Sequence, residues 1–115
     1  MTDLERGYVA GILDGEGTIG INSGQPYITI TQKDLNLIDY LHKLLPDWKV
    51  FAVKDKGYGT YWRITTSKCR IIAPFLREMK PLLIVKAVEV GLVLDFTEKK
   101  LATLHQRRPI TKGEG

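Results

Sequence analysis

Two carboxylates, Asp14 and Glu16, bracket Gly15 directly after an apolar segment with helical spacing. The C-terminus of a helix already carries about half a negative charge, so unscreened carboxylates at this position are unfavourable. Two arrangements relieve the repulsion between these carboxylates and the negative helix end. Both side chains are solvated in a turn, or at least one binds a hard divalent cation through oxygen. Taken alone, the Asp-Gly-Glu-Gly spacing favours the solvated turn.

Three glycines, Gly7, Gly11 and Gly15, fall four residues apart and share one side of the predicted helix. Each interior glycine costs about 0.5 to 1 kcal/mol relative to alanine, so the stripe requires an explanation. One explanation is a second helix packed closely along it, and the alternative is a helix whose glycines loosen its end. The spacing of four favours close packing, because it is a packing geometry rather than a capping one.

Hydrophobic periodicity predicts the elements that carry these residues, with spacings of three and four for helices and alternation for strands. The expected order is a helix over residues 3–14, strands over 18–22 and 27–31, a helix over 34–45, strands over 48–54 and 60–66, a helix over 67–79 and a helix over 83–104. These elements form one domain of residues 1–104. Residues 105–115 are expected to form a polar, basic tail.

Local signals predict where the helices begin and end. Thr2 with Glu5 fits a capping box, and Asp34 and Ser67 are candidate N-caps. Pro74 inside the third helix predicts a late start or a kink, because proline lacks the backbone donor. The residues that give the last helix its spacing include Val85, Val88, Leu92 and Phe96.

This order of elements indicates an α+β fold in which helices cover one face of a sheet. The other face is polar, uncharged in its first hairpin and basic in its second. Its side chains are expected to be Thr18, Gly20, Asn22, Tyr27, Thr29, Thr31, Tyr61, Arg63 and Thr65.

The composition is that of one globular domain, since 43% of the 115 residues are hydrophobic and 26% are charged. Apolar runs such as 82–85 are far shorter than the roughly 20 residues needed to cross a bilayer. The first residues lack a secretory leader, and the single cysteine, Cys69, excludes an internal disulfide. We therefore expect a cytoplasmic or organellar, reducing compartment. The net charge of +4 permits a polyanionic partner without demanding one.

Residues 8–19, Tyr-Val-Ala-Gly-Ile-Leu-Asp-Gly-Glu-Gly-Thr-Ile, resemble the LAGLIDADG motif of homing endonucleases. The resemblance extends over most of the chain, because the family shows the same α-β-β-α-β-β-α order. Further matches are Thr31-Gln32-Lys33 after the second strand, and Lys80-Pro81-Leu82-Leu83, Lys86 and Leu92-Val93-Leu94 around the last helix. The resemblance implies an antiparallel, saddle-shaped sheet covered on one face by helices.

The resemblance also implies a site-specific endonuclease that cleaves double-stranded DNA at a long, pseudo-palindromic target. The family's essential acid is the penultimate motif position, here Glu16, and the carbonyl of Gly15 completes a site for Mg²⁺ or another hard divalent cation. Gln32 matches the residue that orients the water network, and Lys86 matches the basic residue that assists activation or transition-state stabilisation. Asn36 is a departure, because some members carry an arginine there.

A single motif per chain implies a homodimer, because cutting two strands requires two such carboxylates. Two copies of the first helix are expected to pack on Gly7, Ala10, Gly11 and Asp14. The two exposed sheet faces would then lie in the major groove, where each base pair has a distinct pattern of donors and acceptors. The candidate DNA contacts are Asn22, Gln25, Tyr27, Thr29, Thr31, Lys54, Lys56, Tyr61 and Arg63, with Arg107, Arg108 and Lys112 of the tail as candidates for flanking phosphates.

Two other functions are compatible with this pattern. Some family members keep the fold without cleavage and act as RNA splicing maturases or as DNA-binding regulators, but the retained Glu16, Gln32 and Lys86 argue against a loss of cleavage. The second alternative is an interaction domain with no nucleic-acid role, which would show no salt-dependent affinity for DNA.

Overall fold

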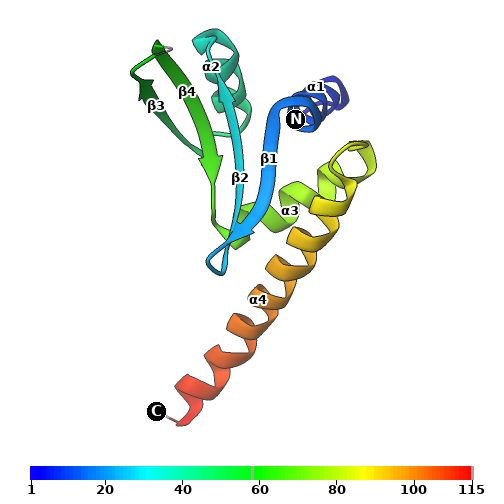
Figure 1. Ribbon diagram of the computed structural model, residues 1–115. Coiled ribbons are helices and arrows are strands. Elements are labelled where there is room, and N and C mark those ends of the chain that lie inside the picture. Colours follow the sequence, from blue (N-terminus) through cyan, green and yellow to red (C-terminus); the bar gives the residue numbers. More distant parts are fainter. Residues whose placement is uncertain (58, 115) are drawn as a thin grey trace.

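The computed structural model describes the backbone of residues 1–57 and 59–114, and the side chains of residues 1–57 and 59–104. The predicted order of helices and strands is confirmed, with one short 3-10 helix added before the last helix (Figure 1). The elements are α1 (Asp3–Glu16), β1 (Gly17–Asn22), β2 (Gln25–Gln32), α2 (Leu35–Leu44), β3 (Lys49–Asp55), β4 (Gly59–Thr66), α3 (Cys69–Met79), η1 (Lys80–Leu82) and α4 (Ala87–Glu114).

The four strands form one antiparallel sheet in the order β1-β2-β4-β3, so the second strand of each hairpin lies at the centre. The helices cover one face of this sheet, with α1 and the first turns of α4 to the right of the strands in Figure 1, and the other face is open. Ile28, Ile30 and Ile64 alternate with polar residues along the two central strands and are fully buried under the helices. The expected α+β fold with one covered face is therefore confirmed.

Helix α1 begins and ends as its local sequence dictates. The predicted capping box is present, with Glu5 N donating to Thr2 Oγ1 at 3.1 Å and Thr2 N donating to Glu5 Oε1 at 2.8 Å. At the other end the Gly17 N–H donates to the Leu13 carbonyl. A Cβ atom at Gly17 would lie 2.7 Å from that carbonyl oxygen, so only glycine lets β1 leave the helix directly.

The expected caps of the next helices have different outcomes. Asp34 caps α2 by accepting a hydrogen bond from Asn36 N at 2.9 Å, as predicted. Ser67 does not cap α3, because the N-cap position falls at Lys68, without a side-chain hydrogen bond. The late start expected from Pro74 is also wrong, since α3 begins at Cys69 and its buried apolar face outweighs the loss of one backbone donor.

The last helix differs most from the prediction. It begins at Ala87 rather than residue 83, and its backbone continues to Glu114. Val85, Val88 and Leu92, which give the segment its helical spacing, are 72%, 73% and 64% exposed. The side of α4 that faces the core instead carries Val90, Val93, Leu94 and Thr97, and Leu83 is buried before the helix begins. None of the helices within the described residues is both long and apolar enough to cross a membrane.

Candidate active site

The end of α1 meets the end of β2 through a direct contact between two side chains. Glu16, the last residue of α1, is exposed, and its Oε2 accepts a hydrogen bond from Gln32 Nε2 at 2.6 Å. The amide oxygen of Gln32 accepts a second bond from Lys33 N at 2.9 Å. Because the amide is bonded at both ends, its nitrogen is directed at the carboxylate. The structure therefore brings together two of the three predicted catalytic residues.

Lys86, the third predicted catalytic residue, is held against the same end of α1 by Asp14. The Asp14 carboxylate accepts from Ile84 N at 2.8 Å and from Lys86 N at 2.9 Å. The Lys86 ammonium in turn donates to the Asp14 backbone carbonyl at 3.0 Å. These bonds place a positive charge at the negative end of the helix dipole, one residue before Gly15.

The hydrogen bonds to Asp14 also change its acidity. Burial of the carboxyl raises its pKa, but the backbone N–H groups of Ile84, Val85 and Lys86 together with the Lys86 charge lower it more. The pKa of Asp14 therefore lies below its ordinary value of 3.8, and the carboxylate is ionised at neutral pH.

The oxygen donors at this helix end suit a hard cation, although one chain supplies only part of a site. Glu16 and Gly15 are both exposed, so the carboxylate and the Gly15 peptide group face solvent. Within the described residues, no group of three His, Cys, Asp or Glu side chains could hold a metal ion. Because hard cations take six or more oxygen ligands, a cation held at this helix end would need further ligands from water, substrate or a second chain.

A hollow of about 440 Å³ adjoins the Glu16–Gln32 pair. Tyr8 and Tyr40 meet edge to face at 5.6 Å beside it. Asn36, the departure from the family pattern, lines the same hollow as Gln32, so an uncharged amide occupies a position close to the predicted catalytic residues. The hollow is lined by Tyr8, Gln32, Asp34, Asn36, Leu37 and Tyr40.

The open face of the sheet carries polar side chains that are fixed by contacts across the strands. Arg63 Nε donates to Thr31 Oγ1 at 3.2 Å, and its guanidinium lies 5.8 Å from the Phe51 ring centre. The hydroxyls of Thr29 and Thr65 are 2.8 Å apart. These bonds orient the groups that would meet a ligand on this face.

Strand pairing decides which candidate contacts share this face. Tyr61 and Arg63 pair with Val53 and Phe51, whereas Lys54 pairs with Thr60 in the opposite pleat. Lys54 therefore does not share the open face with Arg63, and its contact with DNA stays a prediction. The residues on the open side of the sheet are Thr18, Gly20, Asn22, Gln25, Tyr27, Thr29, Thr31, Lys49, Phe51, Val53, Tyr61, Arg63 and Thr65.

Three residues of this region were not among the sequence candidates. Phe51, 43% exposed, lies under Arg63, and Lys49 shares its pleat. Lys33 places its ammonium 5.3 Å from the centre of the Tyr61 ring. Alternation along β3 puts Lys49, Phe51 and Val53 on one face. The β3–β4 register, which the sequence does not give, is needed to show that this is the face of Tyr61 and Arg63.

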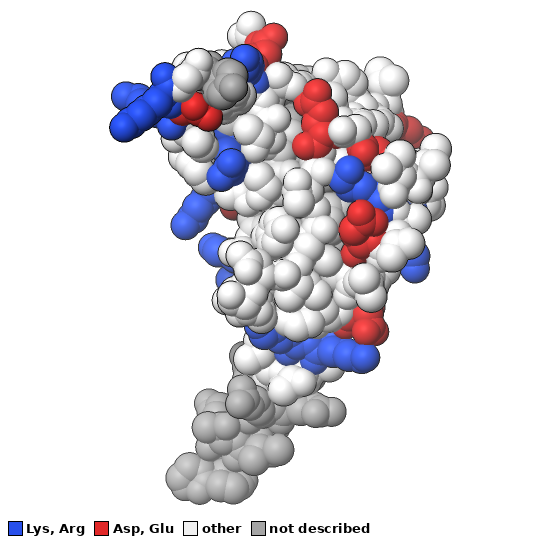
Figure 2. Space-filling model, in the orientation of Figure 1, with Lys and Arg blue, Asp and Glu red and all other residues white. Residues whose placement is uncertain are grey.

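Positive charge gathers around one end of the sheet. Figure 2 shows Lys and Arg side chains around the β3–β4 turn at the upper left and along the left-hand edge. Lys56 lies in that turn, where Asp55 Oδ1 accepts from Gly57 N at 3.0 Å. The side chains of Arg107, Arg108 and Lys112, expected to meet flanking phosphates, lie outside the described residues.

The outer side of α1 agrees only in part with the expected dimer contacts. Gly7 and Gly11 are exposed, and a Cβ atom at either would have no neighbour within 4 Å. Ala10 is only 3% exposed and belongs to the core of its own chain, so its side chain does not lie on this stripe. Asp14 directs its carboxylate to its own chain, as described above, and its role at an interface between two chains stays a prediction.

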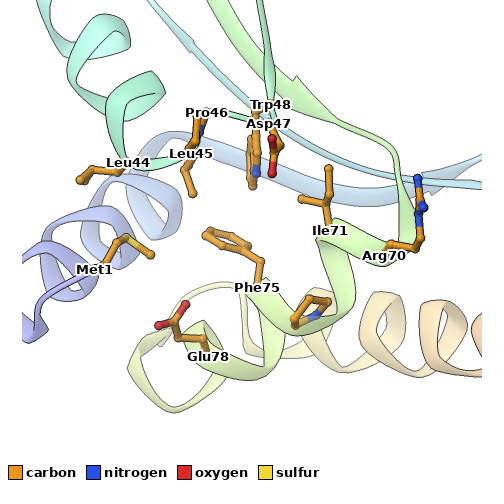
Figure 3. Close-up of a pocket in the computed structure, with 11 residues that line it drawn as sticks. Met1, Leu44, Leu45, Pro46, Asp47, Trp48, Arg70, Ile71, Phe75 and Glu78 are labelled. Carbon is orange, nitrogen blue, oxygen red and sulfur yellow. The ribbon is translucent and has the colours of Figure 1, made fainter.

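A second hollow, of about 370 Å³, lies between the α2–β3 connection and α3. Figure 3 shows Phe75 and Trp48 at its centre, and their rings meet at 5.0 Å and 71°. Both side chains are buried, and the charged residues at the rim include Asp47, Arg70 and Glu78. The hollow does not include any of the predicted catalytic residues.

The family model described as a LAGLIDADG-like domain matches residues 3–80. The chain therefore belongs to the LAGLIDADG-like domain family. The match covers the motif, both hairpins, α2 and α3. No curated protein matches the chain in a sequence search.

Solved homing endonucleases share the fold at low sequence identity. The archaeal intron-encoded homing endonuclease I-Vdi141I, complexed with DNA, is 17% identical with a TM-score of 0.74 over 90% of this chain and 73% of its own. I-CvuI, in complex with uncleaved DNA in the presence of Mg, is 18% identical with a TM-score of 0.71 over 84% and 67%. I-TnaI is 19% identical with a TM-score of 0.67 over 97% and 81%.

Proposed function

We propose that the chain is a site-specific endonuclease that hydrolyses phosphodiester bonds of double-stranded DNA as a homodimer. The observation that carries this proposal is the Glu16–Gln32 pair, an exposed carboxylate at the penultimate motif position held by one side-chain amide at 2.6 Å. The related fold of I-Vdi141I, which was solved in complex with DNA, supports it.

In this proposal Glu16 and the carbonyl of Gly15 hold Mg²⁺ or a similar hard cation, because both offer oxygen ligands at an exposed helix end. When bound, such a cation lowers the pKa of an attacking water and screens the charge of the phosphate. Gln32 keeps the Glu16 carboxylate in one orientation through its hydrogen bond. Lys86 supplies a positive charge beside the scissile phosphate and stabilises the charge that develops there.

The open face of the sheet is the proposed DNA surface. Arg63 is suited to a bidentate contact with guanine or a phosphate, because Thr31 and Phe51 already hold its guanidinium. Thr29 and Tyr27 add neutral donors and acceptors beside it. Lys56, in the β3–β4 turn, is suited to a phosphate contact that positions the duplex.

A homodimer follows from the number of carboxylates. Each chain contributes one Glu16, and two strands must be cut, so two chains are required at one target. The exposed glycines of α1 allow a second α1 to approach closely, which would bring the two Glu16 carboxylates near a twofold axis. The target would then be pseudo-palindromic.

The deciding experiment uses the variant Glu16→Gln, which keeps the shape of the side chain and removes its charge. Wild-type protein is incubated with a randomised duplex library and Mg²⁺, and the cut fragments are sequenced. We expect wild type to cut a pseudo-palindromic target, and Glu16→Gln to bind that target with unchanged affinity without cutting it.

The matched control is Glu98→Gln, because the Glu98 carboxylate also accepts one side-chain hydrogen bond, from Arg77 at 2.7 Å. This variant should cut as wild type does. Undiminished cleavage by Glu16→Gln would contradict the role of Glu16. Wild-type protein without salt-dependent affinity for duplex DNA would contradict the function as a whole.

A further inference from the structure

The tip of the β1–β2 hairpin extends beyond the rest of the sheet. Strand β1 lies at the sheet edge, and in the part of the chain that the structure describes β4 pairs with β2 only over residues 28–32. The residues from 20 to 27 therefore pair with one another and have no third strand beside them. In Figure 1 the β1–β2 turn lies at the lower end of the sheet, next to α4. Because a two-stranded ribbon is only marginally stable by itself, this tip needs support from another element.

Two residues with positive φ close this hairpin. Ser23 has φ 52° and Gly24 has φ 75°, the pattern of a tight type I′ turn between twisted strands. The left-handed region is unfavourable for a residue with a side chain, so the turn keeps some strain at Ser23. The turn joins Asn22 to Gln25, which pair with each other and are both candidates for DNA contact. A shift of the turn therefore moves both of these side chains.

Helix α4 contacts the turn through Lys100. The Lys100 ammonium donates a hydrogen bond to the Gly24 carbonyl oxygen at 2.9 Å. The same ammonium lies 5.3 Å from the centre of the Phe96 ring, which is one helical turn earlier on α4. This part of α4 is fixed to the core, because Thr97 is fully buried and Leu101 packs against the core residues. Lys100 thus links the tip of the hairpin to an anchored part of the helix.

The hairpin tip and the predicted catalytic carboxylate lie at opposite ends of β1. Glu16 directly precedes this strand, and Asn22 ends it six residues later. At about 3.3 Å per residue, the two residues are about 20 Å apart. Base pairs follow one another at about 3.4 Å along a duplex, so the tip would face DNA about six base pairs from the cut.

We infer that Lys100 is a positioning residue for target recognition. By holding the Gly24 carbonyl it fixes the β1–β2 turn, and through the turn it orients Asn22 and Gln25 toward the outer base pairs of each half-site. Lys100 itself does not contact DNA in this arrangement, because its ammonium is directed at its own chain. A fixed turn presents one arrangement of donors and acceptors, whereas a loosened turn adapts to several base pairs. This inference rests on the proposed function and names a residue that sets how strictly the target is selected.

The test compares two neighbouring lysines whose substitution removes the same charge. Lys100→Met removes the bond to the turn, whereas Lys99→Met removes only an ion pair with Asp95, at 3.0 Å on the same helix. Hydrogen exchange without DNA reports on the turn directly. The amides of residues 22–25 should exchange about 2- to 10-fold faster in Lys100→Met, the range for loss of one hydrogen bond. They should exchange at the wild-type rate in Lys99→Met.

With DNA, cleavage is measured on the duplex that wild type selects from a randomised library and on duplexes that differ from it by one base pair. Lys100→Met should lower the discrimination about six base pairs from the cut by about 2- to 10-fold and leave the discrimination next to the cut unchanged. Lys100→Arg keeps a donor for the Gly24 carbonyl and should restore the wild-type profile. The salt dependence of DNA affinity should be the same in Lys100→Met and Lys99→Met.

Either unchanged exchange of residues 22–25 or unchanged discrimination in Lys100→Met would overturn the inference. A salt slope lower by about one in this variant alone would also overturn it, because Lys100 would then bind a phosphate itself. A wild-type chain without affinity for duplex DNA would contradict the proposed function instead. The exchange experiment, which uses no DNA, would then still show whether Lys100 holds the turn.

Discussion

The two carboxylates at the end of α1 are two residues apart and have opposite environments. Asp14 is half-buried, accepts hydrogen bonds from the backbone of residues 84 and 86, and has a lowered pKa. Glu16 is exposed and is held by one side chain, Gln32. The difference shows that one motif carboxylate holds a distant segment of the chain in place while the other remains exposed to solvent.

Removing the Glu16 charge should have the largest effect on cleavage and almost none on stability. Glu16→Gln is expected to lower the single-turnover cleavage rate by about a thousandfold or more, as losses of essential catalytic groups do. Its urea midpoint should match that of wild type, because the exposed carboxylate makes one side-chain hydrogen bond. A large fall in the urea midpoint would contradict the contrast between Glu16 and Asp14, because Glu16 would then stabilise the fold as well.

Changing Asp14 should affect both stability and cleavage. Asp14→Asn removes the charge that holds the segment 84–86, so the urea midpoint should fall and the cleavage rate should drop by about 10- to 100-fold through displacement of Lys86. In the background of Lys86→Met, the further effect of Asp14→Asn on cleavage should largely disappear.

Fully additive effects of the two substitutions on the cleavage rate would separate Asp14 from Lys86 and contradict this link. Hydrogen exchange provides a readout that does not depend on activity. The amides of Ile84 and Lys86 should exchange faster in Asp14→Asn than in wild type, because both donate to the lost carboxylate.

Gln32 should have a smaller effect, confined to cleavage. Gln32→Ala removes the amide that orients Glu16, and we expect the cleavage rate to fall about tenfold with DNA affinity unchanged. Thr103→Ala, an exposed position on α4, serves as the control and should cut as wild type does. Reduced DNA affinity without a slower bound-state cleavage step would assign Gln32 to binding instead.

The smallest effect is the acid dependence of stability. Because the folded-state pKa of Asp14 is lowered, its contribution is fully present above its ordinary pKa of 3.8 and is lost as pH falls below that value through the folded pKa. Urea unfolding at a series of pH values should show wild type more stable than Asp14→Asn at pH 7, with the gap narrowing below pH 3.8. A gap that stays constant down to pH 2 would contradict the lowered pKa.

Features that depend on neighbouring residues could be read from the sequence. The capping box of Thr2 and Glu5, the Asp34 cap and the two hairpins all rest on contacts within a few residues. The motif in residues 8–19 identified the family and placed Glu16 at the end of a helix. Gln32 lies 16 residues from Glu16, and the family resemblance rather than any local rule pointed to it.

Features that depend on distant packing were predicted wrongly or not at all. Counting helical spacing assigned Val85, Val88 and Leu92 to the repeat of the last helix, yet they face solvent. Periodicity gives the sides of a helix and does not say which side meets the core. The burial of Ala10 and the pleat of Lys54 could not be read from periodicity either, because other elements set burial and strand register.

The sequence by itself determined the order of elements, the caps of α1 and α2, and the presence of two carboxylates at the end of a helix. Only the tertiary structure decided that Asp14 turns inward to a segment 70 residues away while Glu16 stays exposed beside Gln32. The physical reason is that two like charges at one helix end are equivalent until partners far away in the chain are brought to one of them. Folding supplied Asp14 with backbone donors and left Glu16 open to solvent.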